Sequence, residues 1–234
     1  MGEILHRVSG KDRKKYYGNL NYFLDFIFPQ RCVFCDSFVE DFSEFGAVCF
    51  SCRNLLREEV SPSVLEDVGD INLLGYVGIY DRMLKICLNR FKYFGFLNLY
   101  KFLGKLLVEV ILENFSNFDI ITFVPMYKKK YLKRGFNQSQ LLASYISKFF
   151  NVEVEKLLIK RKDTPPQSSM NFYGRKRNVK NVFKVDCNDL DGRSILIVDD
   201  VFTTGNTLKE CAKELVLKGA DKVFGVVVAI DYFL

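Results

Sequence analysis

The sequence predicts an α/β protein whose main domain has a largely parallel sheet, preceded by a small cysteine-rich module. The chain of 234 residues is long enough to bury one sizeable core and to carry a small appendage. After Phe118, short apolar runs rich in β-branched residues alternate with helical patterns, which is typical of a parallel sheet with helices on its faces. Before Phe118, two Cys-x2-Cys pairs separated by thirteen residues indicate a module of a different kind.

The chain is expected to divide into three parts. Residues 1–18 are polar and basic, which predicts a flexible tail. A four-cysteine module is expected at 19–60 and the α/β domain at 71–234, with a linker over 60–70. Apolar spacing predicts helices at 20–28, 83–94, 97–112, 138–150 and 207–218. Strands are predicted at 76–80, 119–124, 182–185, 194–198 and 222–230.

Composition and segment lengths exclude several classes of protein. Apolar residues make up 49% of the chain and charged residues 26%, as in globular proteins. The longest apolar run, 223–230, is far shorter than the roughly 18–20 residues of a membrane helix. Residues 1–15 lack the apolar core of an export signal, so we expect a cytoplasmic protein with reduced thiols. The only histidine, His6, lies in the tail, which excludes histidine-based catalysis within the fold.

Positive charge is concentrated in one stretch. Residues 120–184 contain 15 Lys or Arg and 3 acids, a net +12, so the other residues sum to −6 within the total of +6. Two clumps, 128–134 and 175–184, indicate a site for an anion, although a solvated basic surface is the plainer alternative. The segment 160–184, with two prolines and eight basic residues, predicts a flexible loop over a site. Single-stranded nucleic acid would also suit these charges, since rings are interleaved with them: Tyr127, Tyr131, Phe136, Phe172 and Tyr173.

The clearest functional motif lies at 194–207. An apolar strand ends in the acid pair Asp199 and Asp200 and is followed by Val201, Phe202, Thr203, Thr204, Gly205, Asn206 and Thr207, where a helix begins. Ligands of open α/β sheets bind beyond the carboxyl ends of the strands, where this loop would lie. A helix start offers free N–H donors and a positive dipole end to a phosphate, and Gly205 lets the backbone come close. The carboxylates would repel a phosphate and suit the vicinal hydroxyls of a ribose, with or without magnesium.

The helix after this loop has a recognisable start and stop. Thr207 is predicted as the N-cap, with Glu210 completing a capping box. Gly219 is expected to stop the helix, and its apolar face is formed by Leu208, Cys211, Ala212, Leu215 and Val216. The alternative for the whole motif is a solvated Asp-Asp turn followed by an ordinary helix cap.

The four cysteines Cys32, Cys35, Cys49 and Cys52 have the spacing of a zinc ribbon. Four thiolates would close a structural Zn²⁺ site that folds the module without catalysing a reaction. Disulfides are the competing interpretation, which the absence of an export signal disfavours, and a redox Cys-x-x-Cys pair would usually occur singly. Cys87, Cys187 and Cys211 lack ligand spacing and are expected to be packing residues.

The acid pair and its loop resemble the ribose-phosphate signature of type I phosphoribosyltransferases. By that resemblance Asp199 and Asp200 hold the ribose hydroxyls, and residues 203–207 hold the 5-phosphate of phosphoribosyl diphosphate. Two more stretches, PMYKKKYLKRGFNQSQ (125–140) and DTPPQSSMNFYGRKRNVKN (163–181), resemble the ComF/ComFC competence proteins. That family couples a cysteine zinc module to a type I phosphoribosyltransferase fold, and the likeness extends over residues 28–230.

The resemblance also assigns roles to the basic segments. It places a pyrophosphate loop after the strand at 119–124, with the contacts Pro125, Met126, Tyr127, Lys128 and Arg134. An arginine binds a diphosphate through two parallel hydrogen bonds, so Arg134 is the preferred contact. The second clump would contact nucleic acid or close over the site through Arg175, Lys176, Arg177 and Lys180.

Three functions are compatible with these features. The preferred one is a ComF-like protein that binds phosphoribosyl diphosphate with magnesium and assists DNA uptake, where the family implies internalised single-stranded DNA and a helicase-like partner. The second is an active phosphoribosyltransferase that transfers to a base or amine. The third is a zinc-ribbon interaction module whose phosphoribosyltransferase fold is a relic, which the intact acid pair and loop argue against. Fold alone does not decide among them.

Overall fold

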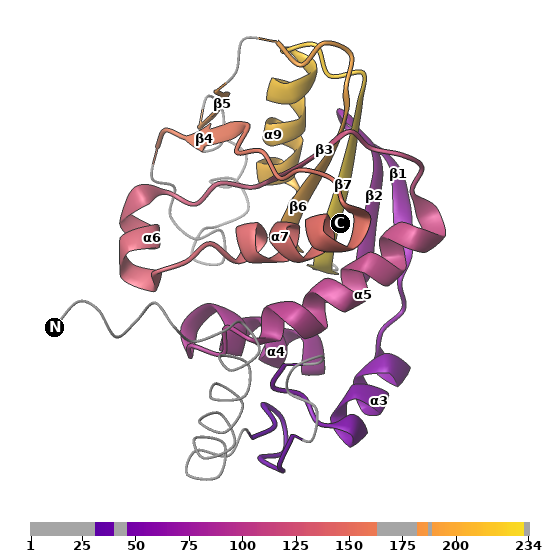
Figure 1. The fold of residues 1–234 in the computed structure, drawn as a ribbon, viewed down its shortest axis with the longest axis vertical. Helices are drawn as coiled ribbons and strands as arrows, with labels where there is room; N and C mark the ends of the chain where they lie inside the picture. Colours follow the sequence, from indigo (N-terminus) through magenta and orange to yellow (C-terminus); the bar gives the residue numbers. More distant parts are fainter. Residues whose placement is uncertain (1–30, 40–45, 163–181, 187–188, 232–234) are drawn as a thin grey trace, which may run out of the picture.

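The computed structural model describes residues 31–39, 46–162, 182–186 and 189–231, which form a covered five-stranded sheet and a helical layer beside it (Figure 1). The helices are α3 (Phe50–Glu59), α4 (Arg82–Tyr93), α5 (Leu99–Asn114), α6 (Lys128–Arg134), α7 (Gln138–Phe150) and α9 (Asn206–Val216). The strands are β1 (Ser63–Val68), β2 (Ile71–Ile79), β3 (Ile120–Phe123), β4 (Leu158–Lys160), β5 (Phe183–Val185), β6 (Ser194–Phe202) and β7 (Lys222–Ile230). None of the helices in these ranges is long and apolar enough to span a bilayer.

The sheet has the order β1-β2-β7-β6-β3, and all its neighbours are parallel except β1, which is antiparallel to β2. β3 pairs with β6 only as far as Phe123 opposite Val198, whereas β7 stays paired with β6 up to Ile230 opposite Phe202. The carboxyl end of β6 therefore continues beyond its β3 neighbour. One side of this end is left open to side chains from the helical layer.

Both faces of the sheet are covered, which is why its central strands are apolar at nearly every position. On β6, Leu196 and Val198 belong to the core shared with α5 and α7, while Ile195 and Ile197 belong to the core shared with α9. Successive side chains of a strand point to opposite faces, so a continuous apolar run serves both layers. The ribbon formed by β4 and β5 packs on the α9 side.

The cysteine segment joins the helical layer at the foot of the sheet (Figure 1). Val33 and Val48 beside the cysteines, and Leu56 on α3, are fully buried in the hydrophobic cluster that also contains α4 and α5. The Arg90 guanidinium on α4 donates a hydrogen bond to the backbone carbonyl of Val33. The described part of the segment therefore shares its core with the helices of the main domain.

The sheet confirms the predicted α/β class and most predicted elements, but the linker predicted at 60–70 is wrong. Ser63–Val68 forms the edge strand β1, joined to β2 by a turn in which Asp67 and Gly69 have positive φ. An edge strand has one side without a neighbouring strand, so β1 is only partly buried. Its sequence, SVLEDV, therefore shows no regular alternation of apolar and polar residues that would predict a strand. β2 accordingly begins at Ile71, well before the predicted start at residue 76.

A second correction concerns the loop predicted after the strand at 119–124, which was expected to include Lys128. Only Val124 to Tyr127 lacks regular structure, and the lysines that follow open the helix α6. α6 has no buried residue, so no apolar stripe revealed it in the sequence. The predicted tail, the helix at 20–28 and residues 163–181 of the basic loop lie outside the described residues.

Candidate functional site

The four cysteines come together in a single cluster. The sulfur atoms of Cys32, Cys35, Cys49 and Cys52 all lie within 4.8 Å of one another. The sulfurs of a tetrahedral zinc site are about 3.8 Å apart, given Zn–S bonds of about 2.3 Å, and those of Cys35 and Cys49 are 3.6 Å apart. The donor set and its spacing therefore fit one structural Zn²⁺ with no ligand position left for a substrate.

Backbone and side-chain groups orient these sulfurs. The N–H groups of Phe34 and Cys49 each donate to the sulfur of Cys32 at 3.4 Å, as expected for a thiolate ligand. Hydrogen bonds from the Ser37 side chain and then its backbone lower the pKa of Cys35 to about 6. Burial raises the pKa of Cys49, so its thiolate is favourable only beside a positive charge. A bound cation would supply that charge.

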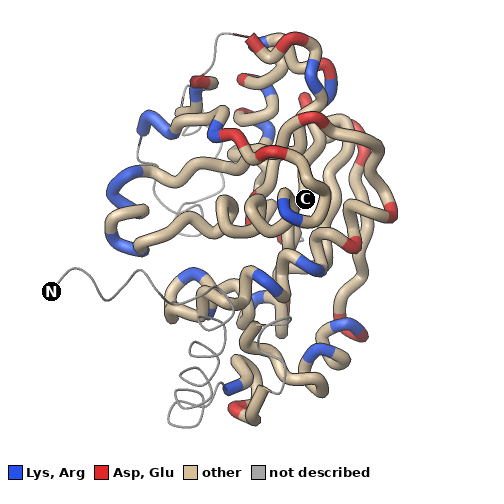
Figure 2. Tube along the Cα trace, in the orientation of Figure 1, with Lys and Arg blue, Asp and Glu red and all other residues tan. Residues whose placement is uncertain are grey.

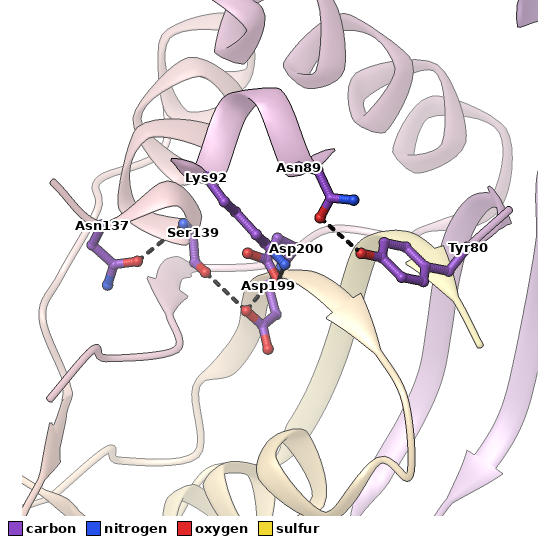
Figure 3. Close-up of polar contacts among 7 residues, drawn as sticks. All are labelled: Tyr80, Asn89, Lys92, Asn137, Ser139, Asp199 and Asp200. Atoms are coloured by element: carbon purple, nitrogen blue, oxygen red, sulfur yellow. Dashed lines mark hydrogen bonds and ion pairs between the residues drawn. The ribbon is translucent and has the colours of Figure 1, made fainter. Parts of the chain in front are cut away.

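The acid pair lies where β6 extends past β3 (Figure 3). Asp200 forms an ion pair with Lys92 of α4, with 3.0 Å between Nζ and Oδ1, and both side chains are only 15% exposed. α4 is also tied to the end of β2, since the Tyr80 hydroxyl donates to Oδ1 of Asn89 at 3.2 Å. The ion pair thus connects the predicted ribose site to a helix more than a hundred residues earlier in the chain.

Asp199 is held from the other side by the start of α7. The Ser139 hydroxyl donates to Oδ1 of Asp199 at 2.8 Å, and the same oxygen accepts from the backbone N–H of Asp200 at 2.9 Å. Asn137 is the N-cap of α7, accepting from the Ser139 N–H and donating to the Val124 carbonyl. The Asn of the RGFNQ segment therefore positions Ser139, and Ser139 positions Asp199.

The two carboxylates have different electrostatic surroundings. Burial, and next the neighbouring charge of Asp200, raise the pKa of Asp199 to about 7. Burial alone would favour the neutral amine of Lys92, but the attraction of Asp200 outweighs it and raises the pKa of Lys92. Asp200 is therefore neutralised by an internal cation, whereas Asp199 has no ion pair with any residue that the structure describes. Carboxylate oxygens of this kind are the ligands that Mg²⁺ prefers.

The loop after β6 forms a small cradle at the start of α9. A cavity of about 20 Å³ is lined by Asp199, Val201, Phe202, Thr203, Gly205, Thr207 and Leu208. Gly205 has φ +72°, and a Cβ there would lie 2.3 Å from the Phe202 ring, so only glycine fits this turn. Gly205 is also the N-cap of α9, which makes the predicted Thr207 cap and its capping box wrong. The helix begins at Asn206, so its first backbone N–H groups lie beside the cavity.

The predicted pyrophosphate loop borders a second, larger hollow. A pocket of about 490 Å³ is lined by Phe123, Pro125, Met126, Lys128, Tyr131, Asn137, Gln140, Lys156, Ile159 and Lys160. Arg134 lies at the other end of α6, with its guanidinium carbon 4.9 Å from the centroid of the Tyr93 ring. Asn137 belongs both to this pocket and to the group that positions Asp199, so the two sites adjoin. Whether Lys128 and Arg134 contact a diphosphate stays a prediction.

Reasoning from the sequence missed Lys92 and Ser139, the side chains that contact the acid pair among the described residues. Lys92 sits in an amphipathic helix among other basic residues, and no local pattern distinguishes it from a solvated lysine. A signal for Ser139 was present, because Asn137 is a good cap and its cap geometry fixes the residue two positions later. The predicted contacts Arg175, Lys176, Arg177 and Lys180 lie outside the described residues.

The chain is similar to known proteins over its α/β domain. The family model of the phosphoribosyl transferase domain matches residues 121–232. The chain is 38% identical over 106 residues to the DNA utilization protein YhgH of Escherichia coli K12, covering 45% of this chain and 46% of that protein. It thus spans about half the length of that relative. It is also 29% identical over 189 residues to competence protein F of Haemophilus influenzae, covering 77% of this chain and 79% of that protein.

Among solved structures, adenine phosphoribosyltransferase from Thermoanaerobacter pseudethanolicus is 14% identical with a TM-score of 0.40, covering 76% of this chain and 99% of that one. The chain therefore has a phosphoribosyl transferase domain over residues 121–232. It is a homologue of competence and DNA utilization proteins, similar to the ComF/ComFC proteins, and has an N-terminal four-cysteine cluster.

Proposed function

We propose that the site at the end of β6 binds phosphoribosyl diphosphate with Mg²⁺. The observation that carries the proposal is the cavity shared by Asp199 of the acid pair and by Thr203, Gly205 and Thr207 of the loop. This cavity lies between a carboxylate, which can accept hydrogen bonds from hydroxyl groups, and the N-terminus of the helix α9. A 5-phosphorylated ribose needs that combination, since its phosphate and its vicinal hydroxyls lie on one compact ring.

Each part of the site has a separate task. The loop 203–207 and the first N–H groups of α9 hold the 5-phosphate, and the acid pair holds the 2- and 3-hydroxyls. Mg²⁺ supplies positive charge for the diphosphate, and Asp199, whose pKa is raised by burial, faces it directly or through water. Lys92 holds Asp200 in place before the ligand arrives. Pro125–Tyr127, Lys128 and Arg134 contact the diphosphate.

The relatives, and not the site alone, support a biological role. Two of them are a competence protein and a DNA utilization protein. We infer that the ligand-bound protein assists DNA uptake, acting on internalised single-stranded DNA in the cytoplasm together with proteins of the competence machinery, including a helicase-like partner. In this role the four cysteines hold a structural Zn²⁺.

A thermal shift experiment tests the ligand assignment. Phosphoribosyl diphosphate with Mg²⁺ should raise the melting temperature, since a ligand present at a hundred times its Kd stabilises the folded state by about 2.7 kcal/mol. Asp199→Asn and Asp200→Asn should each reduce the rise.

Asp221→Asn is a matched control, because Asp221 is exposed and precedes β7, at the opposite end of the strands. If the ligand gives no rise, or if both acid-pair variants keep the full rise, the assignment is wrong.

The second candidate is an active phosphoribosyltransferase. It is favoured by the pocket of about 490 Å³ beside Pro125 and Asn137, which is large enough for a base or amine acceptor. Diphosphate release from phosphoribosyl diphosphate, measured with a panel of nucleobases and amines, separates transfer from binding. Release that depends on the acceptor and is lost in Asp199→Asn establishes the enzyme, whereas a thermal shift without release leaves a binding protein.

A further inference from the structure

One surface of the molecule combines exposed rings with charge of a single sign. The end of α4 and the residue after it expose Tyr93 and Phe94, which are 67% and 70% accessible. α6 exposes Tyr131 and Leu132, which are 44% and 72% accessible. We call this the α4–α6 surface, defined by these four residues and the cations of α6. Aromatic rings gathered on a surface usually mark a place where something binds.

Two ring contacts make the surface continuous. The Arg134 guanidinium at the end of α6 lies over the Tyr93 ring of α4, 4.9 Å from its centroid. Directly after α6, the Phe136 ring packs 5.8 Å from the ring of Phe91, which is buried on α4. The two helices therefore lie side by side, although the long helix α5 and the strand β3 separate them in sequence (Figure 1).

The charge of the surface is one-sided. α6 carries five cations in seven residues, Lys128, Lys129, Lys130, Lys133 and Arg134, and no acid. α4 likewise contains no Asp or Glu. Figure 2 shows α6 and the adjoining end of α4 with blue segments and no red ones. An occupant of this surface must therefore be an anion that also has flat apolar faces.

We propose that the α4–α6 surface binds single-stranded nucleic acid. Bases stack on Tyr93, Phe94 and Tyr131, and the phosphates lie against the cations of α6. Every base offers a π-face to a ring, and every linkage offers one negative charge, so this mode of binding tolerates any sequence. A duplex hides its base faces and binds through charge alone. The proposal rests on the DNA role proposed above and deepens it, and it adds exposed rings of α4 and α6 to which the phosphoribosyl site assigns no role.

A second copy of the chain is the other occupant that exposed rings would suit. In a two-fold dimer the same patch faces itself, so the two α6 helices would meet, each with five cations and no acid. Like charges placed together across an interface cost several kcal/mol. Charge complementarity therefore favours a polyanion.

The surface begins one residue away from the acid-pair site. Lys92 points inward to Asp200, while Tyr93, the next residue of α4, lies on the outside. Consecutive residues of a helix are rotated by about 100° around its axis. The last turn of α4 therefore contributes Lys92 to the acid-pair site and Tyr93 to the α4–α6 surface. A strand lying on Tyr93 and Phe94 would thus pass close to the proposed phosphoribosyl site.

Fluorescence anisotropy with a labelled twenty-residue oligothymidylate tests the proposal on the full-length, zinc-replete protein. Loss of one stacking ring should weaken binding about tenfold, so Phe94→Ala/Tyr131→Ala should weaken it by roughly a hundredfold. Lys129→Gln/Lys133→Gln should reduce the log–log salt slope by about 1.4, at about 0.7 for each phosphate contact. An unlabelled duplex of equal length should compete poorly.

The matched control is Lys148→Gln/Phe149→Ala on the last turn of α7, which removes an exposed lysine and a ring that is 56% accessible. It should bind like the wild type. The proposal is overturned if Phe94→Ala/Tyr131→Ala binds within twofold of the wild type, or if the control loses as much. It is also overturned if sedimentation shows a dimer that these substitutions dissociate, because the occupant is then a second copy.

A parallel thermal shift separates this surface from the phosphoribosyl site. Phe94→Ala should keep the full stabilisation by phosphoribosyl diphosphate and Mg²⁺ while losing strand binding. A wild-type protein that binds the strand but shows no thermal shift would sink the phosphoribosyl assignment and leave the α4–α6 surface standing. The reverse result, a thermal shift without strand binding, would overturn the surface alone.

Discussion

The two candidate sites of this protein are assembled in opposite ways. All four sulfurs of the cysteine cluster come from the short segment between Cys32 and Cys52. The acid pair contributes two adjacent residues, but its partners Lys92 and Ser139 come from helices far away in the sequence. A metal cluster of this kind needs only ligands with the right spacing along a short segment. Carboxylates with little exposure need a cation and hydrogen-bond donors, and these can come from any part of the chain that the fold places beside them.

The largest effect expected from this comparison is at the cysteine cluster. Cys35 is the exposed ligand, so Cys35→Ser removes little packing and tests the metal itself. We expect loss of bound zinc and a loss of stability on the order of 5 kcal/mol, since metal binding supplies folding energy to such a segment. Zinc content per chain and urea unfolding measure the two quantities.

Cys87→Ala is the control for this test, because Cys87 is a fully buried thiol outside the cluster. It should lose stability through packing and still retain one zinc per chain. A Cys35→Ser protein that keeps its zinc and its stability would show that the cluster is not a metal site.

The next largest effect is expected at the remote partner of the acid pair. Lys92→Met leaves Asp200 buried without its cation, which should cost about 2–4 kcal/mol, because removing one partner of a buried ion pair is strongly destabilising. Adding Asp200→Asn to this variant should recover part of the loss, and urea unfolding of the four proteins gives the coupling energy. Additive losses would mean that the ion pair does not hold α4 to the site.

The smallest effect is a dependence on pH. Asp199 has a folded-state pKa of about 7, against about 3.9 in the unfolded chain. The folded state therefore binds more protons between these values, and the free energy of unfolding should fall as pH rises from about 4 to 7. Asp199→Asn should remove this slope, which we expect to be on the order of 1–3 kcal/mol between pH 5 and pH 8.

Melting temperatures of the wild type and of Asp199→Asn, measured between about pH 5 and pH 8 without Mg²⁺, test this expectation. Asp221→Asn is the control and should keep the pH dependence of the wild type. If wild type and Asp199→Asn have parallel profiles, burial does not raise the pKa of Asp199 in the folded protein.

Much of the fold could be predicted because its strands are buried on both faces. The prediction of β7 at 222–230 and of α7 at 138–150 matched the structure residue for residue, since long apolar runs and stripes leave little choice. β1 and α6 escaped prediction for the opposite reason. One is a half-exposed edge strand and the other buries nothing, so neither has an apolar pattern to follow.

The sequence by itself determined the chemistry of the ligand groups. The cysteine spacing, the acid pair and the Thr/Gly loop could be recognised in it, because each of these motifs is formed by residues close together in the chain. Only the tertiary structure decided that Lys92 neutralises Asp200, that Ser139 orients Asp199, and that the end of α4 and α6 share one aromatic and basic surface. These relations are set by how α4, α6 and α7 pack around the sheet, and packing is a property of the whole chain.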